Sequence, residues 1–118
     1  MSRKVLIVDD AVVDRQNLEK ILSAAGHRVL LAESGEQALV RARDDRPDLI
    51  LMDVNMPDLD GFATTRRLKA EPATKDIPVV FVTGKNQKAD IAWGRMLGAK
   101  GYVSKPYTPE QILGQIEG

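Results

Sequence analysis

Cysteine is absent from the 118-residue sequence, which excludes disulfides and thiolate metal sites. The absence fits a reducing compartment, so we expect a cytoplasmic protein. Long hydrophobic runs are missing too: none approaches the roughly 18 residues that a membrane-spanning helix needs. The four apolar residues that follow Lys4 are too few for the core of a signal peptide. A membrane is therefore not expected among the partners.

A net charge of either sign is also missing. Seventeen basic side chains balance seventeen acidic ones, which removes the long-range attraction that would favour nucleic acid or an anionic membrane as a partner. With 43% hydrophobic and 29% charged residues, the composition is that of an ordinary globular protein. The length allows one domain with a real core but not a catalytic domain plus an effector domain. We expect a single domain, residues 1–118, with no output domain in this chain.

The sequence does contain a regular alternation of short apolar runs and segments with helical periodicity. The runs that we expect to form strands are residues 4–8, 27–31, 48–52, 77–82 and 100–103. Strands that are apolar on both faces, each followed by a helix, predict an α/β fold with a parallel sheet covered on both sides. Five such units cannot close a barrel. We therefore expect a flavodoxin-like (βα)5 three-layer sandwich with the strand order 2-1-3-4-5.

Helix boundaries and buried faces can also be predicted. Capping signals occur at Ser34 to Gln37, at Asp60 and at Thr108 to Gln111. The residues expected on the apolar face of the first helix are Val13, Leu18, Ile21, Leu22 and Ala25. In the fourth helix, about residues 86–97, the expected apolar face is Ala89, Ala92, Trp93 and Met96, with Trp93 in the core and Ile91 exposed. Gly94 should make that helix easier to shift, because glycine costs about 1 kcal/mol relative to alanine in a helix.

Polar side chains follow four of the five predicted strands at the point where each strand ends. They are Asp9 and Asp10, Asp53, Thr83, and Lys105. The carboxyl ends of parallel strands meet at one edge of a sheet, so we expect these side chains to lie together. Three carboxylates about 5 Å apart repel by roughly 3 kcal/mol per ionised pair at an effective dielectric near 20, so a cation must offset them. Oxygen ligands without histidine or cysteine select a hard ion, Mg²⁺ above all, for which Mn²⁺ could substitute.

The same set of groups suggests a reaction. A hydroxyl, a lysine and a metal ion around one carboxylate can neutralise several phosphoryl oxygens at once, which phosphoryl transfer requires. Asp53 would then be a carboxylate nucleophile that forms an aspartyl phosphate. Taken alone, each residue has a structural explanation: Asp9 and Asp10 could cap the first helix, Thr83 could be a turn hydroxyl, and Lys105 could be a solvated charge. Only their joint occurrence at four strand ends favours a site.

The ordered motifs resemble those of the receiver domains of two-component response regulators, the CheY-like family. The motifs are Asp9-Asp10, residues 51–61, Val82-Thr83-Gly84, residues 98–102 and Ser104-Lys105-Pro106. The likeness runs from Lys4 to the last helix. It implies that Asp53 accepts a phosphoryl group from a histidine kinase or a phosphotransfer domain. It also implies that Mg²⁺ is bound by Asp10, by Asp53 and by the backbone carbonyl of Asn55, with Asp9 assisting through water.

The resemblance implies further roles at the ends of the fourth and fifth strands. Thr83 and Lys105 are expected to contact the phosphoryl oxygens, and Tyr102 is expected to be the aromatic switch. The switch would change the face formed by the fourth helix, the fifth strand and the fifth helix, where a downstream target would bind. A cis peptide bond between Lys105 and Pro106 is implied as well. The domain is expected to be a monomer or weak dimer that signals rather than catalyses, with only slow self-dephosphorylation.

A finer resemblance concerns the segment from Asp90 to Ala99. It is similar to the stand-alone receivers of type IV pilus twitching-motility systems (PilH-like), which are fed by a chemotaxis-type kinase. This resemblance implies a role in chemotaxis-like control of type IV pilus motility. Two other side chains receive structural interpretations. Asp14 is expected to interact favourably with the helix dipole or to lie at the rim of the acidic pocket, and His27 is assigned no chemistry.

An alternative function also uses an aspartyl phosphate. Mg²⁺-dependent phosphatases of the haloacid-dehalogenase type need the motif Asp-x-Asp, in which the second aspartate is the general acid. Here Asn55 occupies that position, and an amide cannot donate and recover the proton. The sequence therefore favours a phosphoacceptor over a phosphatase.

Overall fold

Five short apolar runs form a parallel sheet in the order β2-β1-β3-β4-β5, as predicted. The computed structural model describes residues 2–117, so the predicted domain bounds at Met1 and Gly118 lie outside the described residues. The strands are β1 (Lys4–Val8), β2 (Arg28–Ala32), β3 (Leu49–Met52), β4 (Val79–Thr83) and β5 (Gly101–Ser104). The helices are α1 (Val12–Ala24), α2 (Gly35–Asp45), α3 (Gly61–Ala70), α4 (Lys88–Met96) and α5 (Pro109–Glu117). Every strand lies within two residues of its predicted range.

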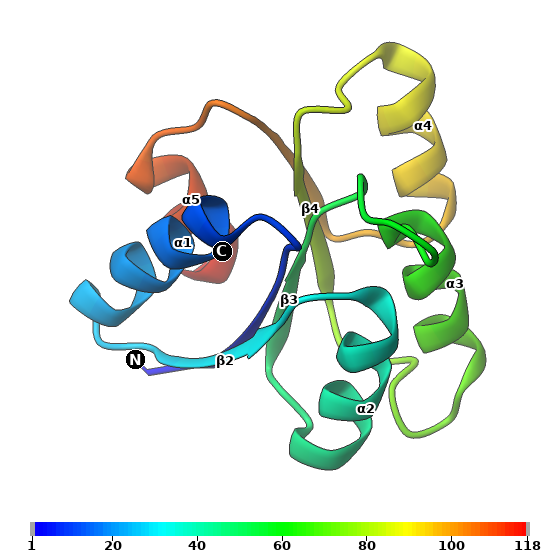
Figure 1. Cartoon of the computed structure of the whole chain (residues 1–118), viewed down its shortest axis with the longest axis horizontal. Coiled ribbons are helices and arrows are strands. Elements are labelled where there is room, and N and C mark those ends of the chain that lie inside the picture. Colours follow the sequence, from blue (N-terminus) through cyan, green and yellow to red (C-terminus); the bar gives the residue numbers. More distant parts are fainter. Residues whose placement is uncertain (1, 118) are drawn as a thin grey trace.

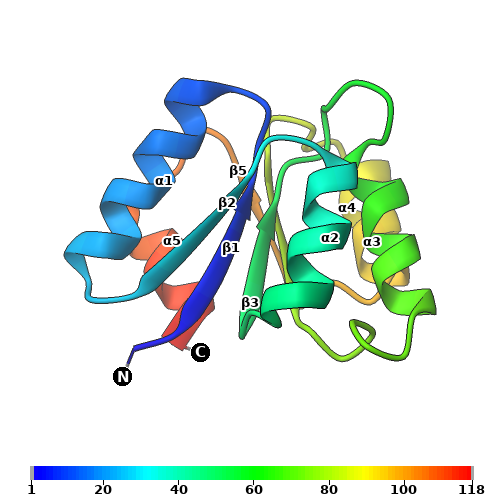
Figure 2. The same cartoon turned by 60° about the horizontal axis from the view of Figure 1, so that its bottom comes forward.

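The helices cover both faces of the sheet. Figure 1 shows α1 and α5 on one face and α2, α3 and α4 on the other, and Figure 2 shows the same division from a second direction. Successive side chains of a strand point to opposite faces, so each strand contributes to two cores. Leu6, Ile50 and Phe81 pack on the side of α2 to α4, whereas Val5 and Leu51 pack on the side of α1 and α5. The predicted three-layer sandwich is therefore confirmed.

Side-chain caps begin three of the helices near the predicted positions. The Asp60 carboxylate accepts a hydrogen bond from the Ala63 backbone N–H at 2.8 Å. At α5 the Thr108 hydroxyl and the Gln111 side chain each accept from the other residue's backbone N–H, at 3.2 and 2.8 Å, which is a complete capping box. At α2 only half of the predicted box forms: Ser34 accepts from Gln37, but the Gln37 side chain accepts from the Glu33 N–H.

The buried face of α1 is narrower than predicted. Leu18 and Leu22 are buried, and Ile21 packs partly against them. The prediction is wrong for Val13, which is 77% exposed, and for Ala25, which is also exposed. Val13 lies five residues before Leu18, which turns it about 140° round the helix at 100° per residue. It therefore lies off the face that contains Leu18 and Leu22 and points to solvent.

The orientation of α4 reverses the prediction. All four residues of the expected apolar face, Ala89, Ala92, Trp93 and Met96, are exposed. Gly94 is the buried residue of this helix, and Ile91, expected to be exposed, is half-buried. A Cβ atom at Gly94 would lie 3.0 Å from the Tyr102 ring and 3.2 Å from the Phe81 ring. Since these rings fill the space between helix and sheet, a side chain at this point of closest approach would have to displace them by a few tenths of an ångström.

Within residues 2–117, none of the helices combines the length and the apolar character that crossing a membrane requires.

Candidate functional site

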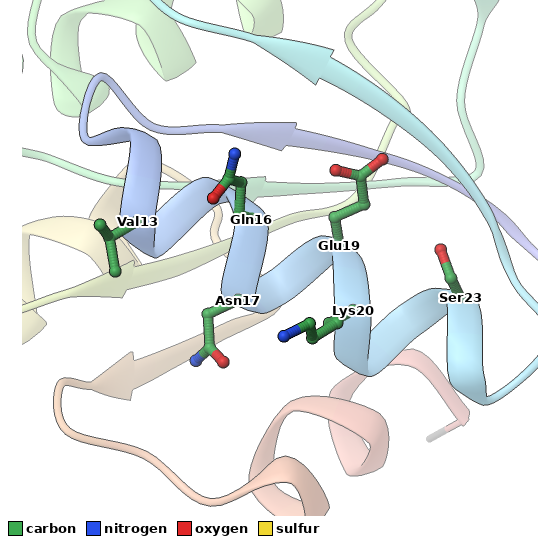
Figure 3. Close-up of a pocket in the computed structure, with 6 residues that line it drawn as sticks. All are labelled: Val13, Gln16, Asn17, Glu19, Lys20 and Ser23. Atoms are coloured by element: carbon green, nitrogen blue, oxygen red, sulfur yellow. The ribbon is translucent and has the colours of Figure 1, made fainter.

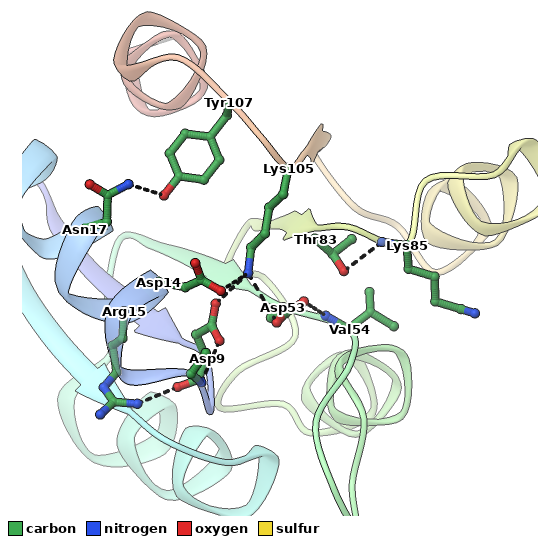
Figure 4. Close-up of polar contacts among 11 residues, drawn as sticks. Asp9, Asp14, Arg15, Asn17, Asp53, Val54, Thr83, Lys85, Lys105 and Tyr107 are labelled. Atoms are coloured by element: carbon green, nitrogen blue, oxygen red, sulfur yellow. Dashed lines mark hydrogen bonds and ion pairs between the residues drawn. The ribbon is translucent and has the colours of Figure 1, made fainter.

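The ends of four strands bring polar residues together at one edge of the sheet, and Figure 4 shows Asp9, Asp53, Thr83 and Lys105 among them. Asp9 follows β1, and Asp53 follows the neighbouring strand β3. Val8 and Met52 are register partners, so both aspartates leave the sheet at the same level. The Asp53 backbone N–H donates to the Val8 carbonyl at 3.0 Å, which continues the ladder to this point. The predicted convergence is confirmed, whereas the role of each residue stays a prediction.

Three carboxylates form an acidic cluster, Asp9, Asp10 and Asp53. One oxygen of each lies within 4.8 Å of the others. Asp9 is 1% exposed and Asp53 is 7% exposed, while Asp10 is open to solvent. Burial raises the pKa of Asp9, and the negative charge of Asp53 raises it further, while hydrogen bonds from Ala11 and Lys105 oppose the shift. Closely spaced carboxylate oxygens that are open to water on the side of Asp10 are suitable ligands for a hard divalent cation such as Mg²⁺.

Lys105 places a positive charge against this cluster. Its ammonium nitrogen lies 2.9 Å from Asp9 Oδ2, 3.0 Å from Asp14 Oδ2 and 3.4 Å from Asp53 Oδ2 (Figure 4). Burial by itself would lower the pKa of Lys105, but the bonds to Asp9 and Asp14 and the charge of Asp53 raise it overall. The lysine is therefore charged at neutral pH, and its positive charge offsets part of the repulsion among the carboxylates. The predicted cis bond between Lys105 and Pro106 is present.

Arg15 holds Asp9 in place, a contact that the sequence analysis missed. Its guanidinium donates to the Asp9 backbone carbonyl at 2.7 Å and lies 3.7 Å from a carboxylate oxygen of Glu33. The Asp9 carboxylate also accepts from the Ala11 backbone N–H at 2.9 Å. Asp9 is thus fixed through both its backbone and its side chain. The signal that could have revealed Arg15 is its place in the first turns of α1, which point toward the end of β1.

The loop after β3 positions Asp53. The Val54 backbone N–H donates to Asp53 Oδ1 at 2.7 Å, which leaves Oδ2 facing Lys105. The Gly61 N–H donates to the Val54 carbonyl at 2.9 Å and folds the loop back against the strand end. Asn55, the predicted backbone metal ligand, lies exposed in this loop two residues after Asp53.

Thr83 and Tyr102 are linked through one residue of the loop between β4 and α4. The Lys85 backbone N–H donates to the buried Thr83 hydroxyl at 3.2 Å, and the Tyr102 hydroxyl donates to the Lys85 carbonyl. The Tyr102 ring packs on Phe81 with ring centroids 5.6 Å apart. Burial, with the charges of Asp90 and Asp53, raises the pKa of Tyr102 to about 12, so the hydroxyl keeps its proton at neutral pH. Thr83 and Tyr102 therefore share Lys85 as a hydrogen-bond partner.

A groove of about 530 Å³ lies elsewhere, along the outward surface of α1 (Figure 3). It is lined by Val13, Gln16, Asn17, Glu19, Lys20 and Ser23. All of these residues come from one helix, so the groove is the surface relief of α1 rather than a cleft between elements. No residue of the acidic cluster lines it. We therefore do not assign the site to this groove.

His27 carries no role in the acidic cluster. It is buried, and its Nδ1 accepts from the Arg3 backbone N–H at 3.1 Å. This contact ties the residue before β2 to the segment before β1.

Comparison with known proteins gives consistent matches over nearly the whole chain. The family model described as response regulator receiver domain matches residues 5–117. Protein PilH of Pseudomonas aeruginosa is 42% identical over 113 residues, which cover 96% of this chain and 93% of PilH. The crystallised chemotaxis protein CheY4 of Vibrio cholerae has a TM-score of 0.92 at 33% identity, with 99% of this chain and 98% of that chain covered.

A further solved structure is similar at the same level. It is the receiver domain of a sensor histidine kinase from Pseudomonas aeruginosa, with a magnesium ion coordinated in its active-site cleft. Its TM-score is 0.90 at 29% identity, and the match covers 99% of this chain and 96% of that chain.

Proposed function

Because the chain belongs to the family of response regulator receiver domains, we propose that Asp53 is the residue that accepts a phosphoryl group. Phosphorylation on an aspartate with Mg²⁺ is general in this family, whose members bind Mg²⁺ at an acidic pocket and interact with histidine kinases and downstream targets. One observation carries the assignment. Asp53 has one oxygen fixed by the Val54 N–H, while the other lies 3.4 Å from Lys105 and the carboxylate borders Asp9 and Asp10.

The surrounding side chains suit transfer from a phosphohistidine. An oxygen of Asp53 attacks phosphorus, the P–N bond of the donor breaks, and the donor imidazole keeps the electron pair. Lys105 supplies positive charge for the phosphoryl oxygens, and Mg²⁺ held by Asp9, Asp10, Asp53 and the Asn55 carbonyl would neutralise further charge there. The Thr83 oxygen accepts from Lys85, so its own hydrogen remains available to donate to a phosphoryl oxygen.

The signal would leave the site through Tyr102 and α4. A shift from 1:99 to 99:1 between two conformations requires about 5.5 kcal/mol of differential interaction. Charge-assisted contacts of the phosphoryl group with Thr83 and Lys105, together with the metal, can supply a differential interaction of this size. Movement of Thr83 toward the phosphoryl group releases Lys85, which frees Tyr102. Since Tyr102 lies against Gly94, its movement acts directly on α4 and changes the α4-β5-α5 face to which a target binds.

The likeness to PilH extends the proposal to the pathway. We assign the domain to chemotaxis-like control of type IV pilus motility, downstream of a histidine kinase, as a signalling domain without multiple-turnover activity.

The proposal is tested with acetyl phosphate, a small phosphodonor, and intact-protein mass spectrometry. With Mg²⁺ the chain should gain the mass of one phosphoryl group, and with EDTA in place of Mg²⁺ it should gain almost none. No gain under either condition would refute the proposal. Release of many phosphate molecules per chain from a generic phosphate ester would instead favour the Mg²⁺-dependent phosphatase.

Binding of Mg²⁺ should raise the thermal stability of the unphosphorylated domain. An ion that binds only the folded state stabilises it by mass action, and a tenfold excess over the dissociation constant gives an increase of about 6 °C in unfolding temperature. Asp10→Ala should lose this gain because it removes the solvent-facing ligand of the cluster. Asp44→Ala, which removes an exposed carboxylate of α2, is the matched control and should keep the gain. Differential scanning fluorimetry measures the shift, and equal responses of the two variants would contradict the assignment.

A further inference from the structure

We propose that Asp14 is a positioning residue that draws Lys105 away from Asp53 and so weakens the hold of the site on a phosphoryl group. The effect on phosphoryl binding rests on the proposed function, whereas the contact between Asp14 and Lys105 does not depend on it. Asp14 Oδ2 lies 3.0 Å from the Lys105 nitrogen, closer than Asp53 Oδ2 at 3.4 Å (Figure 4). The nitrogen therefore lies nearer the α1 side of the site than the side where a phosphoryl group would be attached.

The donor capacity of Lys105 is fully used in this arrangement. An ammonium group has three N–H bonds, and Lys105 has three carboxylate partners, Asp9, Asp14 and Asp53. A phosphoryl group on Asp53 adds oxygens that lie farther out than the carboxylate. To follow them, the lysine has to lengthen or give up one of its shorter contacts, to Asp9 or to Asp14.

Burial decides which contact yields. The Asp9 side chain is 1% exposed, so losing Lys105 would leave a buried carboxylate without its cation, which is costly. The Asp14 side chain is 45% exposed, so water can replace the lysine there. Asp14 is thus the partner that Lys105 leaves on phosphorylation. The cost of leaving it lowers the affinity of the site for a phosphoryl group.

The surroundings of Asp14 hold the contact in place. Asn17, one turn farther along α1, donates to the Tyr107 hydroxyl at 3.0 Å, so the loop after β5 is joined to α1 at two points. A hollow of about 350 Å³ is lined by Asp14, Asn17, Lys105, Pro106 and Tyr107. This space lies beside the lysine and allows its side chain to change direction without displacing the core.

The first test uses beryllofluoride, a stable mimic of the phosphoryl group on a carboxylate. With saturating Mg²⁺, Asp14→Asn should bind beryllofluoride about three- to tenfold more tightly than the parent chain, since a partly exposed charge-assisted bond no longer competes. Asp58→Asn is the matched control. It removes a carboxylate from the loop that follows Asp53, asparagine tolerates its positive φ of 67°, and it has no hydrogen bond or ion pair to Lys105. An unchanged or weaker affinity for Asp14→Asn, or an equal gain for Asp58→Asn, would overturn the inference.

The second test uses Mg²⁺ alone and needs no phosphoryl group. In Asp14→Asn the lysine should move fully onto Asp9 and Asp53 and compete with the ion, which lowers Mg²⁺ affinity by about threefold. In the Lys105→Met background the same substitution should have no effect, because no lysine remains to be repositioned. If Asp14→Asn still lowers Mg²⁺ affinity in the Lys105→Met background, the effect comes from the negative charge of Asp14 itself, and the positioning role is refuted.

The two tests also separate this inference from the proposed function. If the parent chain never binds beryllofluoride or gains a phosphoryl group, while the Mg²⁺ results hold, the proposed function fails and the placement of Lys105 by Asp14 stands. If the parent chain is phosphorylated but Asp14→Asn changes neither affinity, only the inference fails.

Discussion

Replacing Asp53 with asparagine should abolish the phosphoryl mass gain from acetyl phosphate completely. Asparagine has the same shape as aspartate, and its side-chain oxygen can still accept the bond from Val54 that is 2.7 Å long in this structure. What it lacks is the anionic oxygen that attacks phosphorus. Intact mass spectrometry is the measurement, and Asp44→Asn, at an exposed position on α2, should gain one phosphoryl group as the parent chain does. A phosphoryl gain on Asp53→Asn would place the acceptor elsewhere.

Asp53→Asn should also raise the thermal stability of the domain, although it abolishes phosphorylation. Asp9 and Asp53 are both buried and have oxygens within 4.8 Å, a spacing at which two charges repel by about 3 kcal/mol at an effective dielectric near 20. Lys105 offsets part of this repulsion. Without Mg²⁺, Asp53→Asn should therefore unfold at a higher temperature than the parent chain. Stability that increases as function disappears is characteristic of residues kept for chemistry.

Gly61→Ala should destabilise the domain strongly. A Cβ atom there would lie 2.1 Å from the Asp53 carbonyl oxygen and 2.9 Å from Val54 Cα. Both are backbone atoms at the end of a central strand, so neither can rotate aside as a side chain could. Forcing them apart should lower the free energy of unfolding by about 2 kcal/mol or more and displace the Asp53 carboxylate from Lys105. Urea denaturation measures the first effect, and the rate of phosphorylation measures the second.

Gly114→Ala supplies the control with identical chemistry. Gly114 is exposed in α5, and a Cβ atom there would meet nothing within 4 Å. Alanine is the better helix former, so this variant should gain up to about 1 kcal/mol. Opposite signs at the two glycines are the expected result. Equal stabilities would mean that the loop after β3 can relax around a methyl group and that its close approach does not position Asp53.

Much of the fold and the site follows from local patterns. The apolar runs predict strands because side chains buried on both faces leave no place for polar residues. The strand order and the convergence of Asp9, Asp53, Thr83 and Lys105 then follow from the topology of open parallel sheets, in which carboxyl ends share an edge. No knowledge of side-chain contacts is needed for this step, which explains why the candidate site could be predicted before its geometry.

Contacts between distant segments could not be predicted in the same way. The apolar spacing in α4 suggested a buried face that includes Trp93, but the space beneath the helix is filled by Tyr102 and Phe81. The side that comes closest to the sheet is the side with Gly94, and a hydrophobic pattern assigns no direction to glycine. The bond from Lys105 to Asp14 joins residues 91 positions apart. The place of Asp14 in the first turn of a helix left two positions open, the helix dipole and the rim of the acidic pocket, and it did not identify Lys105 as the partner.

The acidic groups of the site follow central strands, whereas its lysine follows an edge strand, so the two differ in how readily local unfolding exposes them. Asp9 and Asp53 follow β1 and β3, which are paired on both sides, whereas Lys105 follows β5, an edge strand that pairs only with β4. Edge strands open more readily than central ones. When β5 separates, the lysine leaves and the buried carboxylates lose their counter-charge, which makes the open state costly. Lys105 therefore raises the free energy of separating β5 from β4. A group that moves the lysine away from Asp9 and Asp53 should change that free energy.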